Sequence, residues 1–152
     1  MTRMTETLDA PDTNPLKLLG RVARGFTRIA DADLREVGLA AGQLPVLVSL
    51  KKSKALSQAE LARIAQVEQP SMAQLLTRME RDGLVERVDD PADKRSRLIS
   101  LTPLAARRLP KARALMEAHS QQALAGLSRA EVAQLFALLQ RVNANVERMG
   151  GG

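Results

Sequence analysis

The segment from Ser57 to Thr102 constrains the fold of this chain more than any other part of the sequence. It begins with two stretches of helical pattern, Ser57–Ala65 and Pro70–Asp82, joined by a tight turn. Two strand-like runs follow, LVERV and LISLT, on either side of the charged loop DDPADKRSR. A helix fits the major groove of DNA, and a thin basic loop can reach the minor groove. The order of these elements therefore predicts a winged helix-turn-helix that reads DNA.

Local signals mark where these elements begin, end and face the core. Ser57 and Glu60 form the S-x-x-E pattern of a capping box at a helix start. Pro70 suits the first turn of a helix, where its missing N–H costs nothing, and Gly83 suits the left-handed residue that ends one. Helical spacing predicts the inward faces of the two helices, which are Leu61, Ile64 and Ala65 on the first and Leu75, Leu76 and Met79 on the second.

The candidates for DNA contact are the residues of the second helix that do not face the core. Glutamine pairs with adenine and arginine with guanine, and early positions on a recognition helix point at base edges. The predicted recognition residues are Gln69, Ser71, Met72, Gln74, Thr77 and Arg78. Contacts to the DNA backbone are predicted for Lys54, Ser57 and Gln58. The alternative is a solvated polar face, which is common on surface helices.

The charged loop is not a simple basic run, because three aspartates precede its bases. The predicted DNA-binding residues of the wing are Asp93, Lys94, Arg95 and Arg97. Asp93 is expected to orient Arg95, since an arginine at a narrow minor groove gains from the negative potential there. The alternative is a hairpin loop with locally paired surface charges, each pair contributing under about 1 kcal/mol.

The run DDPADKRSRLISLT resembles the wing signature of MarR-type winged-helix regulators, with Asp93, Arg95, Leu101 and Thr102 at the defining positions. The run LSQAELARIAQVEQPSMAQLLTRMERDGLVER is similar to the DNA-binding helices and first wing strand of that family, and the resemblance extends over roughly residues 15–149. Ala105 is a departure, since many relatives have glycine there. The resemblance implies a homodimer that binds palindromic double-stranded DNA operators and is often released by a small anionic or aromatic effector.

The helices outside the winged segment have apolar stripes too long for a small lobe to cover. The last helix, which Ser128 and Glu131 open with a second capping box, repeats apolar residues at steps of three and four. This heptad spacing favours a seam shared between two chains over packing within one chain. The predicted dimer contacts are Leu19, Val22, Val132, Leu135, Leu139, Val142 and Val146.

At 152 residues the sequence predicts one domain, mainly α with a small β wing, whose terminal helices intertwine with those of a second chain. The expected parts are a flexible arm 1–13, dimerisation helices 14–37 and 103–149, a winged lobe 41–102 and a flexible tail 150–152. The cap and first residue of the first helix are Asn14 and Pro15. Pro110 predicts a kink or short break in the helix that starts at Pro103.

Composition narrows the function classes. The net charge is +6 and the isoelectric point about 10.5, as expected for a partner of phosphate backbones. The absence of cysteine excludes disulfides and thiol sensing. With His119 the only histidine, the sequence has no catalytic, metal or cofactor site pattern, so we expect no enzyme. The sequence contains no apolar run of about 18 residues, the length that a membrane-spanning helix needs. The expected location is therefore the cytoplasm.

Two alternatives stay open at this point. Arg21, Arg24 and Arg28 are weak candidates for pairing with a ligand carboxylate, and the favoured alternative is solvation or a helix salt bridge such as that of Arg28 with Asp31. For the whole chain, the preferred function is a sequence-specific repressor, with activation left open. The other is a winged-helix module that binds another protein. The polar face from Gln69 to Arg78 argues against that, because protein hot spots favour aromatic residues.

Overall fold

The structure, a computed structural model, describes residues 13–151. The predicted flexible arm, apart from Thr13, and the last residue of the predicted tail lie outside the described residues. The chain divides after Met116 into two compact units.

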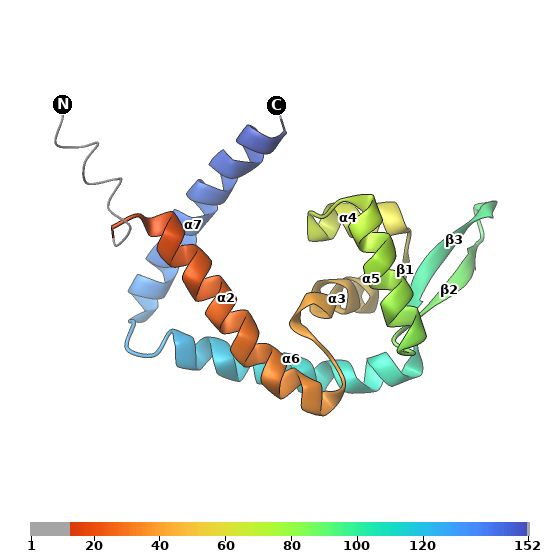
Figure 1. The fold of residues 1–152 in the computed structure, drawn as a ribbon, viewed down its shortest axis with the longest axis horizontal. Coiled ribbons are helices and arrows are strands. Elements are labelled where there is room, and N and C mark those ends of the chain that lie inside the picture. Colours follow the sequence, from red (N-terminus) through yellow and green to blue (C-terminus); the bar gives the residue numbers. More distant parts are fainter. Residues whose placement is uncertain (1–12, 152) are drawn as a thin grey trace. The chain divides into compact units, whose positions relative to one another are not determined.

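The first unit is mostly helical with a small antiparallel sheet (Figure 1). Its elements are α2 (Pro15–Leu34), the 3-10 turns η1 (Arg35–Val37) and η2 (Ala41–Gln43), α3 (Leu44–Ser53), β1 (Ala55–Leu56), α4 (Gln58–Ala65), α5 (Gln69–Arg81), β2 (Val85–Asp90), β3 (Asp93–Leu101) and the start of α6 (Pro103–Ala123). The strand order is β1-β3-β2, and β2 and β3 form the hairpin. This confirms the predicted fold class, a helix-turn-helix of α4 and α5 followed by a wing.

Side-chain caps and left-handed residues set the helix ends. The Leu16 N–H donates to Asn14 Oδ1 at 3.0 Å at the start of α2. Ser57 Oγ accepts from the Glu60 N–H at 3.1 Å at the start of α4. Gln66, with φ 55°, ends α4, and Gly83, with φ 76°, follows α5. These caps confirm the predicted starts of α2 and α4.

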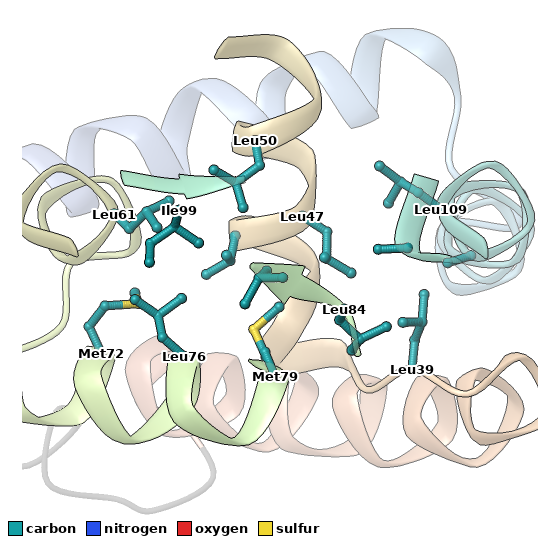
Figure 2. Packing of buried hydrophobic residues seen from close by; sticks show 14 of the residues in the cluster. Leu39, Leu47, Leu50, Leu61, Met72, Leu76, Met79, Leu84, Ile99 and Leu109 are labelled. Carbon is teal, nitrogen blue, oxygen red and sulfur yellow. The ribbon is translucent and has the colours of Figure 1, made fainter. Parts of the chain in front are cut away.

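The core of the first unit lies between α3, α5 and the sheet (Figure 2). Figure 2 shows Met72, Leu76 and Met79 leaving α5 on one side, toward Leu47 and Leu61. All five of these side chains are buried. Full burial of a side chain of this size stabilises the fold by about 1.5–3 kcal/mol. The spacing of four and three residues along α5 therefore fixes which side of that helix faces outward.

The buried face of α4 differs from the predicted one. Leu61 and Ala62 are buried, whereas Ile64, predicted to face inward, is 52% exposed. Ala65 is half-buried. The prediction for Ile64 was wrong because α4 has eight residues, too few for apolar spacing to fix the phase of the buried face.

Thr102 joins the wing to α6 through three hydrogen bonds. Its hydroxyl donates to the Gly83 carbonyl at 2.5 Å and accepts from the Ala105 N–H at 3.2 Å. Its own N–H donates to the Leu84 carbonyl at 3.1 Å. Thr102 thus caps α6 and ties it to the residues that follow α5.

Beyond this cap, α6 runs without a break through Pro110. The short break predicted at this position is absent from the helix. Leu109 and Ala112, on either side of the proline, are both buried. Their packing outweighs the backbone hydrogen bond that proline cannot make.

Replacing Thr102 with valine should lower the free energy of unfolding by about 1–2 kcal/mol, because the Gly83 carbonyl and the first turn of α6 lose a partner. Urea unfolding followed by circular dichroism measures this. Thr27→Val is the control, since Thr27 is an exposed residue of α2. Equal stability of the Thr102 variant and the wild type would show that the hydroxyl has no such role.

The second unit contains the end of α6 and α7 (Arg129–Gly150). The predicted second capping box is confirmed, since the Ser128 N–H donates to Glu131 Oε1 at 2.9 Å and the Glu131 N–H donates to Ser128 Oγ at 3.1 Å. Hydrogen bonds from the backbone and then the side chain of Ser128 lower the pKa of Glu131. Gly150, predicted as tail, belongs to α7. Among residues 13–151, no helix is long and apolar enough to span a bilayer.

Candidate nucleic-acid interface

The face of α5 opposite the core is polar and exposed. It carries five of the six predicted recognition residues, which are Gln69, Ser71, Gln74, Thr77 and Arg78. The sixth prediction, Met72, is wrong, because its side chain is 0% exposed and packs in the core. The buried side follows the spacing Met72, Leu76, Met79, and Leu75, predicted to face inward, is only half-buried. A methionine that fills a core is not available to a DNA base.

Within residues 13–151, Gln74 and Arg78 make no hydrogen bond or ion pair through their side chains, so their donors are available to a partner. Together with Ala73 and Thr77 they line a shallow depression on α5. The Thr77 hydroxyl donates to the Ala73 carbonyl at 2.9 Å. The arrangement presents an amide and a guanidinium side by side, which are the groups that read adenine and guanine.

The predicted backbone-contacting residues differ in what else they do. The Ser57 hydroxyl caps α4, and Gln58 Nε2 donates to Gln69 Oε1 at 3.4 Å, which links the starts of α4 and α5. Lys54 is exposed and has φ 64° and ψ −57°, a strained conformation for a residue other than glycine. Lys54 therefore offers a charge at a fixed position between α3 and β1.

The carboxylates of the wing hold the wing's own loop. Asp90 Oδ1 accepts from the Ala92 N–H at 2.9 Å, and its Oδ2 accepts from the Ser96 hydroxyl at 3.2 Å. Asp93 Oδ1 accepts from the Arg95 N–H at 2.9 Å. Asp93 thus acts on the backbone of Arg95, which sets the direction in which the side chain leaves the loop.

The cations of the wing, Lys94, Arg95 and Arg97, are all exposed. Within residues 13–151 none of them forms an ion pair, so the alternative of locally paired loop charges does not describe this wing. The wing does have one pair that sequence reasoning missed, between Arg87 Nε and Glu80 Oε2 at 3.1 Å. It joins β2 to α5, and no sequence spacing signals a pair that crosses from a helix to a strand.

Of the three arginines proposed as ligand partners, Arg24 and Arg28 line a depression on α2 with Thr27, and Arg21 does not. The predicted Arg28–Asp31 salt bridge is absent from residues 13–151. Asp31 instead uses Oδ1 to accept from the Ala41 N–H at 2.6 Å.

Exposed apolar side chains are concentrated on α2 and in the second unit. They are Leu16, Leu18, Leu19, Val22 and Ile29 on α2, and Leu127, Leu135, Phe136, Leu138, Val146 and Met149 at and along α7. Four of the predicted dimer contacts are in this set, while Val132, Leu139 and Val142 are half-buried in the single chain. Sequence reasoning missed Phe136, which is 63% exposed. It lies beside the heptad positions rather than on them.

Comparison with known proteins gives consistent findings. The sequence profile of the MarR family matches residues 39–96. The chain is 26% identical over 133 residues to the uncharacterized HTH-type transcriptional regulator YybA of Bacillus subtilis, covering 88% of this chain and 89% of that protein. Similar solved structures include a MarR mutant from E. coli complexed with operator DNA, with a TM-score of 0.79, 28% identity and coverage of 87% and 96% of the two chains. The transcriptional regulator SlyA gives a TM-score of 0.82 at 28% identity, over 90% and 96% of the two chains.

The matched segment contains α3, the helix-turn-helix and most of the wing, and the structural likeness extends over most of both units. The chain therefore resembles the MarR family in its helix-turn-helix and wing, and it shares the fold of the transcriptional regulators MarR and SlyA.

Proposed function

We propose that two copies of this chain bind a palindromic DNA operator as a homodimer and repress transcription in the cytoplasm. Each copy inserts the exposed face of α5 into the major groove and Arg95 of the wing into the minor groove. The observation that carries the proposal is the division of α5, with Met72, Leu76 and Met79 in the core and Gln74 and Arg78 unengaged on the outside. The similar E. coli MarR structure, which is complexed with operator DNA, supports DNA as the partner of this face.

The exposed apolar residues of α2 and α7 support the homodimer. Clusters of large exposed apolar side chains often mark a surface that a partner covers. In a symmetric dimer the same residues of both copies are covered at once. Two recognition helices can then enter successive major grooves about 34 Å apart, which matches the symmetry of a palindrome.

In this proposal, a small anionic or aromatic effector binds the regulator and relieves repression. Arg24 and Arg28, which line one depression on α2, supply cations for a carboxylate. An effector that binds better to a dimer with a different spacing of its α5 helices shifts the population away from the DNA-bound form.

The test is binding of the purified protein to the intergenic DNA beside its own gene, against scrambled DNA of equal length at about 150 mM salt, where nonspecific attraction is damped. The proposal expects tight, competitor-resistant binding and a palindromic footprint. Weak binding that is equal on both DNAs would contradict it and would favour a winged-helix module that binds another protein.

Exchange of Gln74 or Gln69 for alanine should change which sequence is preferred, because a glutamine that pairs with adenine contributes to the choice of base. The expected cost is about 1–3 kcal/mol for the preferred base at one operator position and little elsewhere. Selection from a randomised operator library measures this. Arg81→Ala, at the far end of α5, is the control and should leave the preference unchanged. An even loss over all sequences would assign the glutamines to backbone contacts.

A further inference from the structure

A second group of cations lies on η1 and α6, elements that do not belong to the α5 and wing surface. Arg35, Arg107, Arg108 and Lys111 line one depression with a volume of about 530 Å³. Ligand pockets in proteins have volumes of about 300–1,000 Å³. Val37 and Leu104 supply apolar walls. The depression thus has the size and mixed lining of a site for a small organic or inorganic anion.

The structure holds one of these cations in place. Arg108 Nη1 donates to the Gly38 carbonyl at 3.4 Å. Gly38 has φ 74°, and a Cβ added to it would lie 2.6 Å from Arg108 Nη1. Only glycine combines this backbone conformation with so close an approach. Arg108 is therefore positioned before any ligand arrives, which lowers the entropy cost of binding.

The charge of the depression is not balanced by the protein. Within residues 13–151, none of the four cations forms an ion pair. Glu36 is the only carboxylate in the lining. Between Pro103 and Met116 the sequence of α6 has no acidic residue. Four cations gathered around a single carboxylate leave a net positive charge, and an anion with more than one negative charge relieves the repulsion among them.

We propose that this depression binds a small oxyanion of the phosphate class, with at least two negative charges. Arg108 and Arg107 can each offer a fork of N–H donors to its oxygens. The occupant is a small anion rather than the DNA backbone, because Arg108 is half-buried and the site is walled by Val37 and Leu104. The site shares Arg35 with the α2 depression of Arg24 and Arg28, but its other lining residues are different. The proposal does not rest on operator binding.

The test is isothermal titration of the full chain with inorganic pyrophosphate, without DNA and at constant ionic strength. The wild type should bind one pyrophosphate per chain in a saturable way. The double variant Arg107→Gln/Lys111→Gln should bind at least about tenfold more weakly, because it loses two charged partners of the anion. Arg113→Gln is the matched control, since Arg113 is exposed on the same helix and does not line the depression. Its affinity should stay that of the wild type.

A second variant tests the positioning of Arg108. Gly38→Ala should weaken pyrophosphate binding because Arg108 must move, and circular dichroism identifies any loss of fold. The proposal is overturned if the wild type shows no saturable binding, or if Arg113→Gln weakens binding as much as the double variant. It is also overturned if the double variant keeps pyrophosphate binding and loses affinity and salt dependence for DNA, since the cations would then face the DNA backbone.

Discussion

Alanine at Arg95 is expected to weaken operator binding about 10- to 100-fold while the protein stays folded. Arg95 is exposed and has no ion pair within residues 13–151, so its side chain contributes nothing to the fold that the substitution would remove. Its guanidinium gains most where the minor groove is narrow and its potential is strongly negative. Fluorescence anisotropy at about 150 mM salt measures the affinity. Thermal unfolding of the variant should match that of the wild type.

Arg113→Ala removes the same charge from an exposed position on α6 and is the control for nonspecific attraction. Two substitutions of Asp93 then separate charge from positioning. Both Asp93→Asn and Asp93→Ala remove a negative charge near DNA, but only asparagine keeps an oxygen that can accept from the Arg95 N–H. The Asp93→Asn variant should therefore bind DNA more tightly than the Asp93→Ala variant. Wild-type affinity for the Arg95 variant would remove the wing from the DNA contact.

Glutamate at Phe136 is expected to convert the proposed homodimer to monomers of 16.5 kDa. Phe136 is 63% exposed in the single chain, so a charge there does not disturb the chain's own core. In a dimer interface the same charge would be buried without a partner, which costs several kcal/mol. Light scattering coupled to size exclusion measures the mass. Operator affinity should fall by at least about 100-fold, because the two half-sites are no longer bound by linked lobes.

Ala137→Glu is the matched control, since residue 137 lies about 100° further round α7 and is also exposed. Leu139 is a poorer site for the test, because it is half-buried within the single chain and a charge there would also affect folding. If the Phe136→Glu variant remains dimeric, the exposed apolar residues of α7 are not covered by a second copy of the chain.

Much of the winged lobe could be predicted because its signals are local. Ser57, Pro70 and Gly83 each have a backbone reason to stand at an element end, and the predicted bounds of α4 and α5 agree with the structure within a residue or so. The two-residue strand β1 was not predicted, since Ala55–Leu56 shows no periodicity and is a strand only through its pairing with Ser100 and Ile99.

What failed in the sequence reading depended on packing between distant segments. Met72 was assigned to the DNA face because Leu75, Leu76 and Met79 already satisfied an inward stripe, and only the core shows that Met72 replaces Leu75 in it. The contact of Arg108 with Gly38 joins residues 70 positions apart, which no local pattern indicates. The approach of those two segments follows from the packing of η1 and α6.

The burial of Met72 has a consequence for how a protein of this kind can change its target over evolutionary time. Met72 lies between Ser71 and Gln74 in sequence, yet it belongs to the core with Leu76 and Met79. Mutation at Gln69, Ser71, Gln74, Thr77 or Arg78 explores new base sequences at little cost in folding. Mutation at Met72 is filtered first by stability, before any effect on DNA is felt. A lineage can therefore diverge in operator preference along one side of α5 while the other side keeps the lobe intact.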